Sequence, residues 1–345
     1  MDGAFDMLHY GHMNAFRQGR AYGTYLVVGV NSDASIKECK GTAPVMSDDE
    51  RLVAVEGCKF VDEVVPECPY VMDDDYLAMI FDKFKIDYVV HGDDPCIVDG
   101  KNVYQNALDL GKYKTIPRTE GVSTTDIVGR MLLFSKEHHD VAPAAGPATR
   151  SKGKKPDEGA LVSTQKKMMN RPSNFLTTSN FVQLFAQPIR NKPKGAKVVY
   201  IDGAWDMFHA GHIKTLQRAR AMGDYLIVGV VNDEVVNAHR GANYPIMNLN
   251  ERVLSVVGCQ FADDVLIDAP WEISADMIKS LGVKVVVAGT AHDEKSTGTT
   301  KDMTYKVAKE MGIFKEISSE SSLTVTQIVD RILTKEQQYR SKCKY

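Results

Sequence analysis

Two histidines three positions apart lie near the start of the chain, and the stretch that holds them recurs about two hundred residues later. The first copy, DGAFDMLHYGH, spans Asp2–His12, and the second, DGAWDMFHAGH, spans Asp202–His212. The glycine between the two imidazoles of each copy lets backbone approach a ligand closely. A helix that begins here points its partial positive charge at the same place, which favours phosphate. The first copy therefore predicts phosphate chemistry at His9 and His12.

A second polar stretch, RTEGVSTTD, spans Arg118–Asp126 and opens another helix. The planar guanidinium of Arg118 can hold phosphate oxygens in bidentate fashion. Hydroxyl groups at the helix start can donate to the same ligand, and they belong to Ser123, Thr124 and Thr125. The alternative is that Thr124 or Thr125 only caps the helix.

Two further cations and one acidic stretch are candidates for the same site. Lys40 precedes a glycine, and Arg51 lies in a helix that a capping box opens. Each is either a phosphate ligand or a surface charge. The stretch HGDD, from His91 to Asp94, ends a strand, where Asp93 can bind a sugar hydroxyl or a metal ion.

Short apolar runs alternate with helical patterns in both copies. Val198–Ile201 and Tyr225–Val230 predict strands, and the segment between them has apolar residues at helical spacing. Capping boxes at Ser47–Glu50 and Asn248–Glu251 predict helix starts at equivalent places. This alternation predicts an α/β fold with a parallel sheet and helices on both faces. Such folds bind ligands at the carboxyl edge of the sheet, where the histidine stretch must lie.

The repeat divides the chain into two domains. We expect an N-terminal domain over residues 1–137, a linker over 138–195 and a C-terminal domain over 196–337. Residues 138–169 are rich in Pro, Gly and Lys and lack periodicity, and a bridging helix is expected near 174–187. One residue precedes Asp2, whereas a full strand precedes Asp202. The first strand is therefore expected to be truncated and the natural chain to begin earlier.

Composition and charge exclude several classes of protein. A net charge of −3 argues against a dedicated nucleic-acid binder, which would be strongly basic. Neither a signal segment nor an apolar run of roughly 18 residues is visible, so no transmembrane segment is predicted and the cytoplasm is the expected location. The six cysteines show no Cys-x-x-Cys spacing and predict neither a zinc site nor disulfides. Cys58 and Cys259 occupy equivalent places and are expected to pack as small apolar residues.

The combination of His-x-Gly-His with Arg-Thr-x-Gly-Val-Ser-Thr-Thr resembles the paired signature of the cytidylyltransferases, within the nucleotidylyltransferase superfamily. Two tandem copies joined by a linker are similar to the ethanolamine-phosphate cytidylyltransferases. The resemblance implies two tandem Rossmann-like α/β domains. It also implies transfer of a cytidylyl group from CTP to phosphoethanolamine, which gives CDP-ethanolamine and pyrophosphate for phosphatidylethanolamine biosynthesis.

The resemblance carries expectations about cofactors and partners as well. It implies Mg²⁺ bound with CTP, small-molecule substrates and no nucleic-acid partner. It is compatible with a homo-oligomer and with peripheral attachment to the endoplasmic reticulum. The tandem domains are expected to pack against each other as a homodimer of single-domain relatives would.

By this resemblance the expected catalytic residues are His9, His12, Lys40 and Arg118. The histidines are expected to contact the α- and β-phosphates, Lys40 the attacking phosphate and Arg118 the leaving pyrophosphate. No dedicated metal ligands are expected. The residues expected to bind CTP are Gly3, Ala4, Phe5, Asp6, Arg51, His91, Asp93, Arg118, Thr119, Gly121, Ser123, Thr124 and Thr125.

The second copy keeps only part of this set. Its last helix places Ser319 opposite Arg118 and the stretch SLTVTQIV opposite GVSTTDIV, so a guanidinium, a glycine and one hydroxyl are missing. The counterparts that remain are His209, His212 and Arg252. We therefore expect the second domain to be a non-catalytic partner that supports or regulates the first.

Three other functions were compared with this one. A class I aminoacyl-tRNA synthetase also has a His-x-Gly-His element, but it needs a Lys-Met-Ser-Lys-Ser-like loop and a large basic surface, and neither is visible. A choline-phosphate cytidylyltransferase stays open, because the sequence does not locate the cage that a trimethylammonium group requires. A non-catalytic regulator that binds CTP or CDP also stays open.

Overall fold

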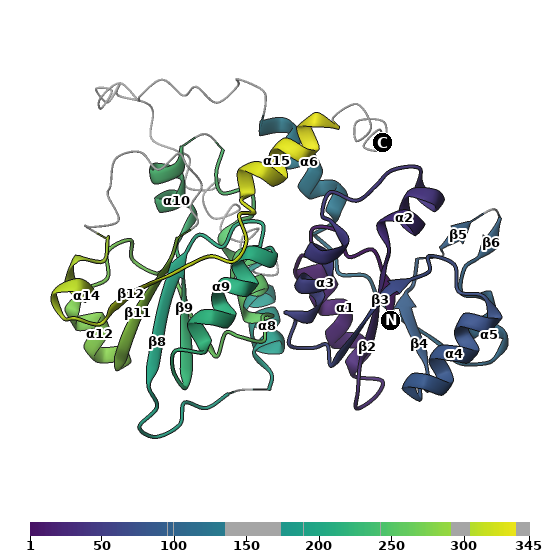
Figure 1. Ribbon diagram of the computed structural model, residues 1–345, viewed down its shortest axis with the longest axis horizontal. Coiled ribbons are helices and arrows are strands. Elements are labelled where there is room, and N and C mark those ends of the chain that lie inside the picture. Colours follow the sequence, from purple (N-terminus) through teal and green to yellow (C-terminus); the bar gives the residue numbers. More distant parts are fainter. Residues whose placement is uncertain are drawn as a thin grey trace, which may run out of the picture.

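The computed structural model has two α/β domains packed side by side (Figure 1). It describes residues 1–134, 174–290 and 304–335, apart from the single positions 95, 99, 189 and 242. The stretch 138–169 that the sequence assigns to the linker lies outside the described residues. Both domains have the strand–helix alternation predicted from the sequence.

The elements of the first domain are β1 (Asp2–Gly3), α1 (Tyr10–Arg20), β2 (Val27–Asn31), α2 (Asp33–Lys40), α3 (Asp48–Glu56), β3 (Glu63–Cys68), α4 (Asp74–Phe84), β4 (Val89–Gly92), β5 (Ile97–Val98), β6 (Lys101–Asn102), α5 (Gln105–Asp109), β7 (Tyr113–Ile116) and α6 (Thr124–Phe134). A helix between the domains, α8, spans Asn174–Ala186. The elements of the second domain are β8 (Val198–Gly203), α9 (Ala210–Arg220), β9 (Tyr225–Val230), α10 (Asp233–Arg240), α11 (Leu249–Val257), β10 (Asp264–Ile267), α12 (Ala275–Leu281), β11 (Val283–Gly289), α14 (Lys306–Glu310), β12 (Phe314–Ile317) and α15 (Val325–Thr334).

The second domain has one parallel sheet with the strand order β10-β9-β8-β11-β12. The strand order reverses between β8 and β11, and doubly wound folds bind ligands at the carboxyl ends of the strands at such a point. In the first domain β1-β2-β3 form one parallel sheet and β4-β7 another. β8 pairs with strands on both sides, whereas the two-residue β1 pairs with β2. The fold class predicted from the sequence is confirmed.

Side-chain caps fix where the helices around the loops begin. His9 and His209 are the N-caps of α1 and α9, and each ring accepts a hydrogen bond from the backbone two residues later. The capping boxes predicted at Ser47–Glu50 and Asn248–Glu251 are both present. The repeated sequence motifs thus set the same helix starts in both domains.

The domains meet through equivalent residues of the two copies. Cys58 faces Cys259 in an antiparallel backbone bridge, where the N–H of Lys59 donates to Gly258 O at 2.9 Å and the N–H of Gln260 donates to Gly57 O at 2.8 Å. Burial raises the pKa of Cys58 to about 12 and that of Cys259 to about 11. Both thiols therefore stay protonated and pack as apolar groups.

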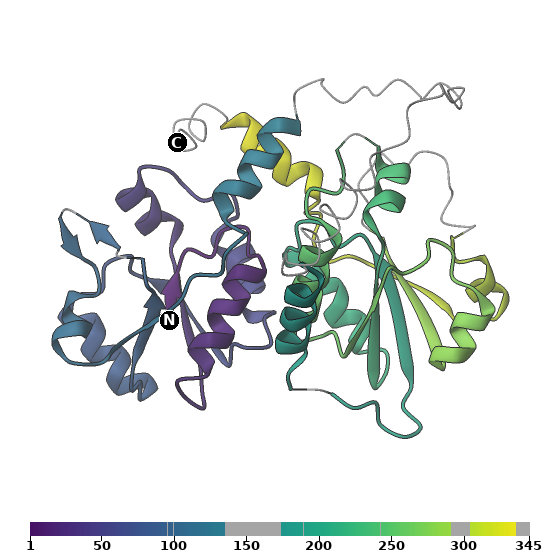
Figure 2. The ribbon, with the colours of Figure 1, turned by 180° about the vertical axis from the view of Figure 1, so that it is seen from behind.

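One hydrophobic core runs through both domains and includes α8. On α8 the fully buried Phe185 packs edge-on against Phe60 of the first domain, with ring centroids 5.6 Å apart. The same helix contacts α11 of the second domain. The view from behind shows α8 in this position between the domains (Figure 2). The interface is thus a continuous core in which the two halves fold against each other.

Candidate active site

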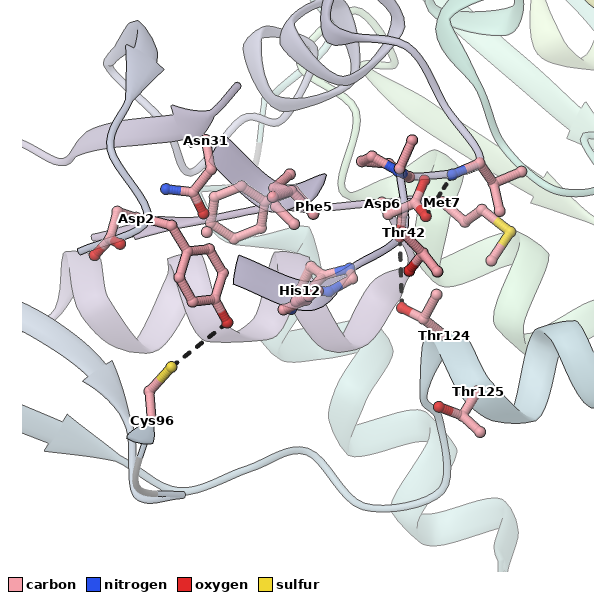
Figure 3. A pocket seen from close by; sticks show the side chains of 18 of the residues that line it. Asp2, Phe5, Asp6, Met7, His12, Asn31, Thr42, Cys96, Thr124 and Thr125 are labelled. Carbon is pink, nitrogen blue, oxygen red and sulfur yellow. Dashed lines mark hydrogen bonds between the residues drawn. The ribbon is translucent and has the colours of Figure 1, made fainter. Parts of the chain in front are cut away.

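A cavity of about 450 Å³ opens at the carboxyl ends of β1, β2 and β4 in the first domain. Its walls are the β1–α1 loop, the segment that follows α2, and the start of α6 (Figure 3). The residues that line it are Asp2, Gly3, Ala4, Phe5, Asp6, Met7, His12, Asn31, Ile36, Lys40, Thr42, Ala43, Pro44, Val45, Tyr70, His91, Cys96, Tyr104, Thr124, Thr125 and Val128. This volume lies in the range of small-molecule sites.

The two histidines of the first copy lie against each other. Their rings stack with centroids 3.9 Å apart, and His12 lines the cavity while His9 is buried behind it. Nδ1 of His9 accepts from the N–H of Gly11 at 3.1 Å, and Nδ1 of His12 accepts from the N–H of His9 at 3.4 Å. These bonds assign the remaining ring proton to Nε2 in both residues.

Both imidazoles are neutral at pH 7. Burial lowers the pKa of His12 to about 4, and the nearby charge of Arg118 adds to the effect. Burial also lowers the pKa of His9 well below its usual value, as do the neighbouring His12 and Arg118. The pair therefore offers neutral N–H donors to a ligand without adding positive charge.

Asp6 ties together the loops that surround the histidines. Its carboxylate accepts from the N–H groups of Val45 and Met46 at 2.8 and 2.9 Å, and the Thr124 hydroxyl donates to its carbonyl oxygen at 3.5 Å. Phe5 and Met7, on either side, have φ of 49° and 46°, a conformation that costs free energy for residues with a side chain. Asp6 thus holds a strained loop in place by bonds to two other segments.

The three candidate cations occupy different positions. Lys40 lines the cavity, with Nζ 5.1 Å from the centroid of the Tyr70 ring. Arg51 is 1% exposed and lies beneath the loop, where it donates to Ala4 O at 2.6 Å and pairs with Asp33 and Asp48. It does not line the cavity, and its Nη1 and Nη2 atoms bond to the protein.

Arg118 lies near the two histidines but outside the cavity lining. Its side chain is 63% exposed and forms an ion pair with Asp94 at 3.1 Å. It does not line the cavity, yet its charge is close enough to lower the pKa of both histidines. The guanidinium therefore adds positive charge on the side of the histidines.

The remaining predicted residues divide into two groups. The structure brings Gly3, Ala4, Phe5, Asp6, His91, Thr124 and Thr125 together in the cavity lining. Ser123 instead caps α6, since its hydroxyl donates to the Asp126 carboxylate at 2.6 Å and accepts from the Asp126 N–H at 3.1 Å. The Thr119 hydroxyl donates to Gly11 O at 3.5 Å and accepts from Asn14 at 2.9 Å. Asp93 is exposed, and Gly121 turns the chain with φ of 85°. The residues of this second group surround the cavity and do not line it.

The sequence analysis missed a carboxylate at the far end of the cavity. Asp2 is 5% exposed and accepts from the Tyr104 hydroxyl at 3.2 Å through Oδ2, while Oδ1 has no hydrogen-bond partner among the residues that the structure describes. Figure 3 shows His12 between this end, with Asp2, Asn31 and Cys96, and the opposite end, with Thr42, Thr124 and Thr125. The same aspartate–tyrosine hydrogen bond occurs in the second domain, where the Tyr305 hydroxyl donates to Asp202 at 2.6 Å. The presence of both residues at equivalent places in the two copies was the signal in the sequence that could have identified Asp2.

Comparison with known proteins agrees with this geometry. A family model described as cytidylyltransferase-like matches residues 1–130 and 200–336. The chain is 44% identical to an ethanolamine-phosphate cytidylyltransferase from Arabidopsis thaliana over 99% of this chain and 81% of the relative. It is 43% identical to one from Dictyostelium discoideum, over 99% and 92%. The chain belongs to the ethanolamine-phosphate cytidylyltransferase family. A choline-phosphate cytidylyltransferase of Arabidopsis thaliana is 40% identical over 38% of this chain and 43% of the relative.

The two cytidylyltransferase-like domains differ at their cavities. The second-domain cavity has a volume of about 140 Å³, and His209, His212 and Arg240 line it together with Ser319 and Val325. The histidine rings again stack at 3.9 Å. Arg252 repeats the role of Arg51, since it is buried and pairs with Asp233 at 2.6 Å. The histidine pair and the buried arginine are therefore duplicated, whereas the residues that line the two cavities differ.

The carboxylates of the cavity do not form a metal cage. No group of three or more His, Cys, Asp or Glu side chains is placed to hold a metal ion in the part of the chain that the structure describes. Both Asp6 oxygens accept hydrogen bonds from backbone N–H groups.

None of the described helices is long and apolar enough to cross a membrane.

Proposed function

We propose that the first-domain cavity is the site at which this chain transfers a cytidylyl group from CTP to phosphoethanolamine, with release of pyrophosphate. The observation that carries this proposal is the arrangement of Figure 3, in which His12 lies between an end with Thr42 and the α6 residues Thr124 and Thr125 and an end with the buried carboxylate of Asp2. The first end suits polyphosphate and the second suits a cationic amine.

The reaction follows from charge stabilisation. An oxygen of the phosphoethanolamine phosphate attacks the α-phosphorus of CTP as the bond to pyrophosphate breaks in line. Nε2–H of His12 donates to the phosphate oxygens, and His9 holds that ring by stacking. Lys40, whose Nζ lies 5.1 Å from the centroid of the Tyr70 ring, neutralises the charge of the attacking phosphate. Preorganised donors of this kind contribute most where charge develops, and removing one typically costs a factor of about 10²–10³.

The leaving pyrophosphate is held at the cavity mouth. Thr125 donates its hydroxyl hydrogen at the N-terminus of α6, whose partial positive charge faces the same place, and Thr124 exchanges its long bond to the Asp6 carbonyl oxygen for a bond to the pyrophosphate. Arg118 exchanges its exposed partner Asp94 for the more highly charged pyrophosphate. The exposed starting position of Arg118 leaves the mouth open for CTP to enter.

The acceptor's amine lies at the Asp2 end. A primary ammonium donates to Asp2 Oδ1, the oxygen that lacks a described partner, and lies beside the ring of Tyr104. A trimethylammonium has no N–H to donate to this oxygen and is larger. The carboxylate end therefore supports ethanolamine over choline as the acceptor's head.

Mg²⁺ would accompany CTP as part of the substrate and would supply further positive charge to its phosphates. The second domain is non-catalytic, a proposal supported by its smaller cavity and by Ser319 in place of Arg118. Cytoplasmic location, attachment to the endoplasmic reticulum and homo-oligomers stay predictions from the sequence.

A pyrophosphate-release assay with CTP and three acceptors tests the proposal. We expect the highest kcat/KM with phosphoethanolamine and much lower values with phosphocholine and glycerol 3-phosphate. Equal or faster turnover with phosphocholine would support the choline alternative. Tight CTP binding without pyrophosphate release from any acceptor would instead support a non-catalytic regulator.

A further inference from the structure

The last helix of the second domain reaches the wall of the first-domain cavity. α15 lies alongside α6 in both views (Figures 1 and 2), and the two helices contact each other. On α15, Arg331 donates to both carboxylate oxygens of Glu50 at 2.6 and 2.8 Å, and to the carbonyl oxygen of Val45 at 3.2 Å. A guanidinium of one domain thus bonds two groups of the other.

The first-domain partners of Arg331 are a residue of the segment that closes one side of the cavity and the α3 carboxylate that bonds this segment. Val45 lines the cavity, and its N–H donates to the Asp6 carboxylate at 2.8 Å. Glu50 accepts from the N–H of Ser47 at 2.9 Å within the capping box of α3. The 44–47 segment is therefore fixed from the cavity side by Asp6 and from the opposite side by Arg331.

The contact is built to hold a position. Glu50 is 18% exposed at its side chain, and Arg331 meets it with two parallel bonds, which fixes orientation as well as distance. The 44–47 segment follows Lys40 by a few residues and carries the amides that hold Asp6. A small shift of this segment would move both the cation and the strained loop.

We propose that Arg331 is a positioning residue that the second domain supplies to the first-domain active site. It holds the 44–47 segment so that Lys40 and the Asp6 loop have the spacing that the transfer needs. The proposal rests on the proposed function of the first cavity. It gives the second domain a direct role in turnover without any chemistry of its own.

The chain offers a matched control in the reciprocal contact. Arg130 of α6 donates to both oxygens of Glu251 at 2.7 and 2.9 Å and to the Ile246 carbonyl at 3.3 Å. Ile246 is not among the described residues that line the second cavity, whereas Val45 lines the first. Arg331→Met and Arg130→Met thus remove equivalent sets of interdomain bonds. Arg331→Met frees the segment that lines the first cavity at Val45, whereas Arg130→Met acts on α6 beyond Val128, the last α6 residue in the cavity lining.

The experiment compares both variants with wild type in the pyrophosphate-release assay. We expect Arg331→Met to lower kcat about 10- to 100-fold, the size of effect that small misplacement of catalytic groups produces, and to leave KM for CTP within about threefold. Arg130→Met should keep kcat within about twofold. Hydrogen exchange should rise in peptides covering residues 40–50 in Arg331→Met alone.

Each outcome decides between positioning and interface stability. Equal losses of kcat in both variants, or no loss in Arg331→Met, would overturn the proposal. If Arg331→Met does not fold, Arg331→Lys, which keeps the charge opposite Glu50, must show the reduced kcat and faster exchange. A fully active Arg331→Lys with unchanged exchange would refute the proposal. Wild type without pyrophosphate release would contradict the proposed function itself.

Discussion

The carboxylate at the far end of the first cavity makes a selective prediction. Asp2→Asn keeps an oxygen for the Tyr104 hydroxyl, and it replaces the oxygen that lacks a described partner by an NH₂ group. An NH₂ group donates hydrogen bonds and cannot accept one from the ammonium of phosphoethanolamine. The charge-assisted bond is therefore lost, while the size of the side chain is unchanged. The variant therefore isolates the charge of Asp2 from its packing.

The magnitude follows from the burial of Asp2, which is 5% exposed. A hydrogen bond to a charged group at such a place contributes about 1.5–3 kcal/mol. This free energy corresponds to a loss of about 10- to 150-fold in kcat/KM for phosphoethanolamine. KM for CTP should change little, because its phosphates occupy the opposite end.

Steady-state kinetics with each substrate varied in turn measures both effects. Asp202→Asn is the matched control, since Asp202 accepts from Tyr305 at 2.6 Å in the second domain. This variant should remain within about twofold of wild type. The reasoning fails if Asp2→Asn leaves KM for phosphoethanolamine unchanged, or if it weakens CTP to the same extent.

Three further predictions concern the histidines and the hydroxyls. His12→Ala should lower kcat by about 10²–10³-fold, whereas His212→Ala should leave it within about twofold in the pyrophosphate-release assay. Thr124→Val, which introduces the residue of the second copy, should lower kcat about tenfold. Burial lowers the pKa of His12 from 6.5 to about 4. The unfolded chain then binds more protons below pH 6.5, so the free energy of unfolding falls as the pH falls from 6.5 toward 4. In His12→Gln the loss between pH 7 and pH 5, measured by urea unfolding, should be smaller by roughly 2 kcal/mol.

Particular outcomes would contradict these expectations. Equal losses in His12→Ala and His212→Ala would place catalysis in both domains. An active Thr124→Val variant would show that the second copy's valine is not a defect. If His12→Gln and wild type lose the same stability at pH 5, His12 does not exclude its proton in the folded chain.

The parts of the fold that local rules control were predictable from the sequence. The capping boxes need residues three positions apart, and the strand–helix alternation follows from apolar periodicity, so both could be inferred without tertiary contacts. The family was predictable for the same reason, because each of its two motifs consists of neighbouring residues in the sequence. Local chemistry was therefore sufficient for the elements and for the identity of the family.

The position of each polar side chain depended on contacts between distant segments. From the sequence, Arg51 could be a surface charge or a phosphate ligand. In the structure it is buried, and its guanidinium donates to the Ala4 carbonyl oxygen and to the Asp33 carboxylate. The bond between Asp2 and Tyr104 spans 102 residues, and no local pattern predicts it. The Arg331–Glu50 pair spans 281 residues and required the packing of two domains.

The backbone bridge between Cys58 and Cys259 lies in an interface whose two sides are encoded in one chain, and this affects how the two halves can diverge. In a symmetric dimer of one gene product, a contact between residues i and j occurs twice, and a substitution changes both copies together. Here the mirrored contacts Arg130–Glu251 and Arg331–Glu50 are encoded separately in one chain. One half can therefore lose a guanidinium, as at Ser319, while the other keeps Arg118 and the backbone bridge between Cys58 and Cys259 remains. Because the two halves are encoded in one chain, each can change its cavity residues independently, which two identical subunits of a symmetric dimer cannot do.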